Sequence, residues 1–318
     1  MDLAIDAQHL TREFTVRRRG AGRSVVRAVD DLTLRLEHGE AVGFVGANGA
    51  GKSTTIKMLT GILTPTRGEV AVLGRRPVPE RRHLAREIGV VFGQRSQLWW
   101  DLPLQDSFEI LGSMHRLSPG AKAARLERLV AGLDLAPFLD RPVRQLSLGQ
   151  RMRGEVAAAL LHSPRLVVLD EPTIGLDMIS KEGLRRFLVE DRAERGTTLL
   201  LTTHDMADVE RLCERIVVVS DGRTAYDGTL AGLRSSLRTP RELVLDLAEP
   251  RDALVLPGGV ELLAVEAGGI RHRVRFLAEE HSAAALIAAI SAQVDIADLS
   301  MAEPAIEDLV REIFARGA

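Results

Sequence analysis

Short apolar stretches alternate with amphipathic ones through most of the chain, and this alternation predicts a largely parallel sheet covered by helices. Apolar stretches that predict strands lie at 40–45, 68–74, 88–93, 165–170 and 197–203. Segments with helical spacing lie at 53–63, 178–193 and 205–214. The Asp221-Gly222 pair, inside a β-rich segment, predicts the turn of a hairpin. The predicted fold class is therefore α/β, because strands that alternate with helices pair in parallel.

Two regions depart from this alternation. Residues 3–45 alternate between apolar and polar positions and end in an apolar run, which predicts antiparallel strands followed by a buried one. Residues 105–162 are rich in helical patterns, with breaks at 118–120 and 141–145. We interpret the basic stretch at 17–23 as the solvated tip of a hairpin, with a contact to lipid or nucleic acid as the alternative.

A second, smaller domain is expected after residue 230. Residues 229–240 predict a short helix and a linker that ends at Pro240. The pattern beyond predicts strands near 241–247, 260–266 and 270–277, a helix at 280–292, a strand or turn near 295–300 and a final amphipathic helix at 304–315. A chain of 318 residues is long enough for two domains of about 150 residues each. We expect a main domain over 1–230, a linker over 231–240 and a small α+β domain over 241–318.

Composition excludes several classes of protein. Lys+Arg 42 and Asp+Glu 44 give a net charge of −2, so we expect no nucleic-acid partner held by phosphate neutralisation. The single cysteine, Cys213, cannot form an internal disulfide, which favours a reducing compartment. The longest apolar run, 283–290, is shorter than the roughly 18 residues of a membrane-spanning helix. The first ten residues lack the features of a secretory signal, so we expect a cytoplasmic chain unless a partner holds it at a membrane.

Residues 46–53 read Gly-Ala-Asn-Gly-Ala-Gly-Lys-Ser between an apolar strand and a helix, which is the context of a phosphate-binding loop. Glycines let the backbone turn tightly, and N–H groups at the helix start then point at an anion. Lys52, one of four lysines, supplies a charge for the β- and γ-phosphates, and Ser53 supplies a hydroxyl for Mg²⁺. Asn48, the single asparagine, tolerates unusual backbone angles. The residues expected to bind ATP here are Gly46, Ala47, Asn48, Gly49, Ala50, Gly51, Lys52, Ser53 and Thr54.

A second apolar strand ends in two carboxylates, Asp170 and Glu171. Because ligands bind at the carboxyl ends of parallel strands, we expect Asp170 to reach a Mg²⁺ near Ser53. We expect Glu171 to orient and deprotonate the water that attacks the γ-phosphate. A guanine nucleotide is disfavoured, because the Asn-Lys-x-Asp element that reads guanine needs an asparagine outside the phosphate-binding loop.

Residues 146–150 read Leu-Ser-Leu-Gly-Gln, and with the two motifs above they resemble the LSGGQ signature of ABC transporter ATP-binding subunits. The resemblance covers residues 3–228 and implies the P-loop ABC cassette fold, with a helical subdomain at about 95–162. It implies that Gln94 is a catalytic residue and metal ligand, together with the ligands Ser53 and Asp170. It also implies that His204 acts with Glu171 in catalysis and that Phe14 stacks on adenine.

The same resemblance implies a head-to-tail dimer with ATP buried at the interface, as a homodimer or as a heterodimer with another ABC ATPase. Residues that would contact the partner's ATP are Ser147, Gly149, Gln150 and Asp177. Two departures from the family pattern stand out. Leu148 replaces the first glycine of the signature, and its side chain must point away from the nucleotide. Ile174-Gly175 replaces the commoner Ser-Ala of the D-loop, the segment that ends at Asp177.

Residues 93–115, with a Glu303-Pro304 terminal helix, resemble the ABC-2-type exporter branch. That branch implies a motor subunit on the inner face of the membrane, bound to separate permease subunits, with 241–318 as a ferredoxin-like accessory domain. An importer ATPase and a soluble ABC protein acting on ribosomes or DNA remain alternatives. Trp99 and Trp100 are interpreted either as core residues or as anchors in a groove for a membrane subunit.

Overall fold

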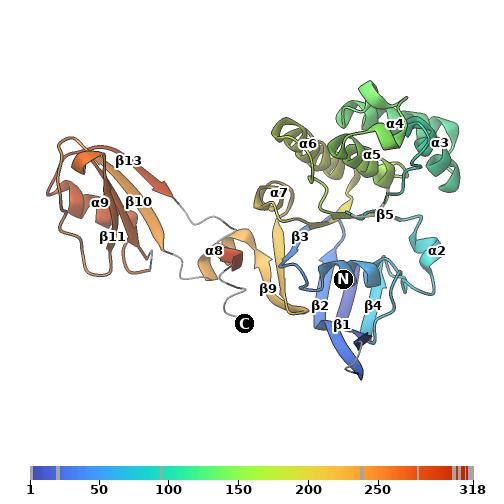
Figure 1. Ribbon diagram of the computed structural model, residues 1–318, viewed down its shortest axis with the longest axis horizontal. Helices are drawn as coiled ribbons and strands as arrows, with labels where there is room; N and C mark the ends of the chain where they lie inside the picture. The colour runs from blue at the N-terminus through green and yellow to red at the C-terminus, as the bar shows by residue number, and fades with distance from the viewer. Residues whose placement is uncertain are drawn as a thin grey trace. The chain divides into compact units, whose positions relative to one another are not determined.

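The computed structural model describes residues 3–18, 22–93, 96–236, 240–277 and 279–302, together with 306, 309–311 and 313. The chain divides into two compact units, Met1–Leu230 and Ala231–Arg316 (Figure 1). Among the helices formed by the described residues, none is both long and apolar enough to cross a bilayer.

A six-stranded sheet forms the centre of the first unit, in the order β5-β6-β7-β3-β8-β9. Its strands are β5 (Ile88–Val91), β6 (Leu166–Asp170), β7 (Thr198–Thr202), β3 (Ala41–Gly46), β8 (Arg215–Ser220) and β9 (Arg223–Thr229). The first five strands run parallel, and β9 returns antiparallel to β8 through the predicted turn at Asp221 and Gly222. The parallel order confirms the α/β prediction and brings the ends of β3, β6 and β7 to one edge.

A three-stranded antiparallel sheet lies beside the central one, in the order β2-β1-β4. It contains β1 (Leu3–Arg18), β2 (Gly22–Glu37) and β4 (Arg67–Val72). The strand predicted at 68–74 therefore pairs with β1 and not with the parallel strands. Its first residues are exposed, whereas every residue of β3 is buried, so β4 suits a sheet with one solvated face.

One apolar core joins the two sheets to helix α1 (Lys52–Leu59). It includes Ile5, Leu34, Phe44, Ile56, Val168 and Leu200. Because β3 and α1 are both anchored in this core, the turn that connects them, residues 47–51, is held at both ends.

The predicted helix-rich region contains α3 (Leu104–Met114), α4 (Pro119–Gly132) and α5 (Leu148–Leu160), which Figure 1 shows grouped beside β5. The two predicted breaks are a capped helix start at Ser118 and a short 3₁₀ turn, Val143–Gln145. The remaining helices of the unit are α2 (Arg81–Leu84), α6 (Met178–Arg195) and α7 (Met206–Leu212), with a 3₁₀ turn at Ala136–Phe138. A buried ion pair between Arg125 and Asp191 ties α4 to α6.

The second unit contains a four-stranded antiparallel sheet in the order β11-β12-β10-β13. Its elements are α8 (Leu230–Ser236), β10 (Arg241–Leu247), β11 (Glu261–Glu266), a 3₁₀ turn at Ala267–Gly269, β12 (Arg271–Phe276), α9 (Ala283–Ser291) and β13 (Ile296–Ala302). This strand order is that of a ferredoxin-like sheet, but residues 248–260 hold no helix between the first two strands. In the predicted terminal helix the described residues are helical, and Glu303-Pro304 lies outside the described residues.

Candidate functional site

The chain is tightly packed at both ends of the turn after β3, because Gly46 at the end of the strand and Gly51 at the end of the turn lie against neighbouring backbone. A Cβ on Gly46 would lie 2.5 Å from the carbonyl oxygen of Val219, and one on Gly51 would lie 2.4 Å from that of Ala28. Gly51 also has a φ of 100°, which side-chain-bearing residues rarely adopt. Gly49 has a φ of 88°, whereas Asn48 is not among the residues with positive φ.

Lys52 lies inside this turn, with only 8% of its surface exposed. Its Nζ donates hydrogen bonds to the carbonyl oxygen of Gly46 at 2.5 Å and to that of Ala47 at 3.2 Å. Burial lowers the pKa of the ammonium group, and the carboxylates of Glu171 and Asp170 act against that change. A compact cation is therefore held where the turn meets two acids from another strand.

Asp170 ends β6, and its carboxylate accepts a hydrogen bond from the Thr202 hydroxyl at 2.5 Å. Thr202 is the last residue of the neighbouring strand β7, so the parallel pairing alone places the two side chains together. Ser53 is exposed in the first turn of α1. Carboxylate and hydroxyl oxygens are the donors that Mg²⁺ prefers, so both fit the predicted metal site. Gln94, the third predicted ligand, lies outside the described residues.

Glu171 and His204 are in contact, with 3.1 Å between Oε1 and Nε2. Glu171 has a φ of 58°, rare for a side-chain-bearing residue, and its N–H donates to the carbonyl oxygen of Thr202 at 2.9 Å. Burial raises the pKa of the Glu171 carboxyl; His204 and Lys52 oppose the rise. Strained backbone of this kind clusters at functional sites. The structure thus brings together Lys52, Asp170, Glu171 and His204.

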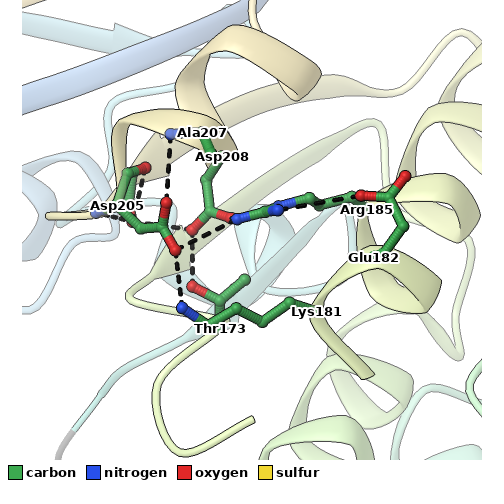
Figure 2. A network of polar contacts seen from close by, with 8 residues as sticks. Thr173, Lys181, Glu182, Arg185, Asp205, Ala207 and Asp208 are labelled. Atoms are coloured by element: carbon green, nitrogen blue, oxygen red, sulfur yellow. Dashed lines mark hydrogen bonds and ion pairs between the residues drawn. The ribbon is translucent and has the colours of Figure 1, made fainter. Parts of the chain in front are cut away.

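A polar network next to this site, shown in Figure 2, was not anticipated from the sequence. Its centre is Asp208 of α7, which is fully buried. The Asp208 carboxylate accepts hydrogen bonds from the hydroxyls of Thr173 at 2.6 Å and Thr203 at 2.9 Å, and from Arg185 Nε at 2.7 Å. The network therefore ties the segment after Glu171 and the segment before His204 to helix α6.

Asp205, which follows His204, extends the network. Lys181 Nζ donates to Asp205 at 2.7 Å, and Arg185 donates to the same carboxylate at 3.2 Å. Burial is the largest single influence on Asp205 and opposes its ionisation, but the hydrogen bond and charge of Lys181, the charge of Arg185 and the Ala207 N–H together outweigh it and lower the pKa. Lys181 is one of four lysines in the chain, and this scarcity was the sequence signal that could have pointed to it.

The signature and D-loop residues form a second cluster, at two helix starts. Ser147 caps α5: its hydroxyl accepts from Gln150 N–H at 3.2 Å, and its own N–H donates to Gln150 Oε1 at 3.0 Å. Asp177 caps α6 through Ser180 N–H at 2.9 Å, and its hydrogen bonds with Ser180 lower the pKa of Asp177. A Cβ on Gly149 would lie 2.8 Å from the carbonyl oxygen of Gly175, so the two helix starts touch.

Aromatic residues predicted at the edges of the site lie on the surface or near it. Phe14 is half-buried on β1, and the Arg12 guanidinium lies 4.7 Å from its ring centroid. Trp99 and Trp100 are 36% and 52% exposed, so their interpretation as core residues is wrong. Arg151 lies 5.6 Å from the Trp100 ring centroid. A cavity of about 240 Å³ lies beside Trp100 and is lined by Phe92, Leu148, Arg151 and Met152, among others.

The sequence of this chain is similar to those of known ATP-binding proteins. A family model for ABC transporters matches residues 29–174. The ABC transporter ATP-binding protein NatA of Bacillus subtilis (strain 168) is 33% identical over 217 residues, which cover 68% of this chain and 88% of NatA. The Nod factor export ATP-binding protein I of Neorhizobium galegae is 39% identical over 234 residues, 71% of this chain and 62% of that protein. The chain therefore spans less than two thirds of the Nod factor export protein.

Solved structures agree with the sequence matches. The ATP-binding subunit of an ABC transporter superposes with a TM-score of 0.64 at 28% identity, over 73% of this chain and 92% of that one. A dimeric ATP-binding cassette in a post-hydrolysis state, bound to ADP and Pi, has a TM-score of 0.64 at 27% identity, over 71% of this chain and 98% of that one.

The fold and the phosphate-binding turn define a P-loop ATPase of the cassette type. The chain belongs to the ABC transporter family and is an ATP-binding subunit of it. Subunits of this kind are ATPases that dimerise and work with membrane permeases. The predicted P-loop cassette fold is confirmed.

Proposed function

We propose that this chain hydrolyses ATP at the cluster formed by Lys52, Asp170, Glu171 and His204, and that hydrolysis drives export through separate membrane subunits. The observation that supports this best is the 3.1 Å contact between Glu171 and His204 beside a buried lysine. The glycine turn and Lys52 hold the phosphates of ATP, because N–H groups and an ammonium group converge there. Phe14 contributes a ring face for adenine.

Mg²⁺ is the metal that the donor oxygens of Ser53 and Asp170 suit, and Gln94 is the proposed third ligand. When bound, the ion neutralises charge on the β- and γ-phosphates. The Thr202 hydroxyl keeps one Asp170 oxygen in place, so that the other is free to face the metal. The pairing of β6 with β7 thus sets the orientation of the Asp170 carboxylate.

Glu171 is the proposed general base, and it accepts the proton of the attacking water at a carboxylate oxygen. Its raised pKa makes it a better proton acceptor than an exposed carboxylate. His204 Nε2, 3.1 Å from Oε1, holds that carboxylate in one orientation. Asp208 holds Thr173, two residues after Glu171, and Thr203, directly before His204. Both members of the pair are therefore anchored to the same carboxylate and keep their relative positions.

Two copies, or this chain and another ABC ATPase, are proposed to enclose ATP between them. Ser147, Gly149, Gln150 and Asp177 would face the ATP held by the partner's turn. Two observations support this. The helix starts at Ser147 and Asp177 adjoin one another, and the apolar side chains next to Asp177, Met178 and Ile179, are 85% and 86% exposed. Apolar surface of that kind favours a protein partner.

Export is proposed because several relatives are named Nod factor export ATP-binding proteins. The permease would contact the exposed Trp99 and Trp100 beside the small cavity next to α5. Trp is favoured as an anchor at protein interfaces. The chain would then lie on the inner face of the cell membrane, held there by its permease. Membrane subunits that co-purify with the chain, and the direction in which vesicles carrying them move substrate, test this part.

Substitution of the base tests the catalytic proposal. Glu171→Gln keeps the shape and the contact with His204 but removes the proton acceptor. We expect ATP binding to persist and turnover to fall by about 10²–10⁴-fold. Glu190→Gln, at an exposed carboxylate of α6, is the matched control and leaves turnover unchanged. Phosphate release measures turnover, and full activity in Glu171→Gln would assign the base to another residue.

A further inference from the structure

Two of the residues that depart from the family pattern, Leu148 of the signature and Gly175 of the D-loop, touch each other in this chain. An ideal Cβ on Gly175 would lie 2.5 Å from Leu148 Cδ2 and 2.6 Å from its Cγ. Contacts that short do not occur between real carbon atoms. The Leu148 side chain therefore occupies the space that a side chain at position 175 would need, and the two departures are one structural feature.

The contact lies between the two helix starts that carry the proposed trans contacts. Leu148 is the first residue of α5, directly after Ser147, and Gly175 lies two residues before Asp177. Gly175 has a φ of 74°, and its carbonyl oxygen faces Gly149. On the other side, Thr173 is tied to buried Asp208 at 2.6 Å. The turn at 174–176 is thus held by Leu148 from one side and by the network from the other.

We propose that Leu148 is a positioning residue, which sets the D-loop turn against the start of α5 so that Ser147 and Asp177 form one surface for the partner subunit. This inference rests on the proposed two-subunit ATP site. Leu148 also lines the cavity beside Trp100, so the same side chain reaches from the proposed permease groove to the D-loop. It acts through Gly175 and contacts no nucleotide itself.

A double-mutant cycle in the Glu171→Gln protein tests this inference. Gly175→Ala places a methyl group against Leu148, and we expect it to raise the ATP concentration for half-maximal dimerisation by at least about tenfold. Adding Leu148→Gly removes the collision and returns that concentration to within about threefold of the parent, although each change alone is harmful. Light scattering at increasing ATP measures dimerisation, below the melting temperature of every variant.

Two controls separate positioning from general damage. Gly196→Ala introduces the same methyl group at a φ of 65° with nothing within 4 Å, so it costs backbone strain without a collision and leaves dimerisation unchanged. Binding of a fluorescent ATP analogue to the monomer stays equal across the cycle, which a merely misfolded site would not show.

The outcomes distinguish this inference from the proposed function. A Glu171→Gln parent that never dimerises with ATP overturns the two-subunit site formed by two copies of this chain, on which the inference is tested. A parent that dimerises, with Gly175→Ala as competent as the parent, overturns the positioning role alone. So does a Gly175→Ala defect that Leu148→Gly fails to rescue, since backbone strain at φ 74° then accounts for it.

Discussion

At the scale of single residues, the position of Lys52 decides whether the turn can hold a triphosphate. Its ammonium group is almost fully buried and already donates two hydrogen bonds inside the turn. An ammonium group that is already buried loses little bound water when a phosphate binds beside it. The compact ammonium group of lysine therefore suits this position.

Lys52→Ala tests this directly. A hydrogen bond to a charged group contributes about 1.5–3 kcal/mol, so we expect ATP affinity to fall by roughly 10- to 100-fold. Lys57→Ala, on the same helix but outside the turn, is the matched control and keeps the affinity of the parent. Titration calorimetry with ATP and Mg²⁺ measures both, and equal affinity in Lys52→Ala would place the phosphates elsewhere.

At the scale of elements, helices α3 and α5 meet the central sheet through a pair of stacked histidines. The rings of His115 and His162 are parallel to within 13°, with centroids 3.8 Å apart. His162 Nε2 also lies 2.9 Å from the carbonyl oxygen of Ile88 on β5. Burial lowers the pKa of His162 to about 4, and the charge of His115 contributes to the shift. Two neutral rings therefore pack well at this junction, and protonated ones would not.

This junction makes stability depend on pH. The native pKa of His162 lies below its ordinary value of 6.5, so the unfolded chain binds the proton first. The contribution of His162 to stability is then full above pH 6.5 and is lost as pH drops toward 4, at no more than about 1.4 kcal/mol per pH unit. We expect His162→Gln, which keeps a hydrogen-bonding group near Ile88, to flatten this dependence. Denaturant unfolding between pH 7 and 5 measures it, and an unchanged slope in His162→Gln would assign the dependence to another group.

The elements that the sequence predicted correctly are those whose signal lies in one continuous segment. The phosphate-binding turn and the strand ending at Asp170 are continuous segments, so neighbouring residues carry the whole signal. The Asp208 network joins Thr173, Lys181 and Asp205 across separate elements, and no periodicity encodes such a contact. The sequence likewise predicted β4 as a strand but not its partner. β4 pairs with β1 because its exposed residues suit a sheet with one face in water, and that choice is made by tertiary packing. Leu148 and Gly175 were both seen as departures, but only tertiary packing joins them.

At the scale of the whole molecule, the two units have separate apolar cores. The core of the first includes Phe44 and Val168, close to the phosphate-binding turn. The core of the second is built from Leu243, Leu245, Leu247, Val274, Phe276, Leu286 and Ile290. Every described residue of the candidate site belongs to the first unit. Ligand binding should therefore stabilise one core and leave the other as it was.

Calorimetry of the full chain tests this division. We expect two unfolding transitions, of which ATP with Mg²⁺ raises only the one that belongs to the first unit. At a ligand concentration of 100 times Kd the gain is about 2.7 kcal/mol, enough to move a midpoint by several degrees. Glu171→Gln, which retains ATP during the scan, makes the shift easier to resolve. In Lys52→Ala the same ligand concentration gives a much smaller shift, because affinity is lost. A single transition would mean that the two cores unfold as one cooperative unit, and an equal shift of both transitions would mean that ATP binding stabilises the second unit as well.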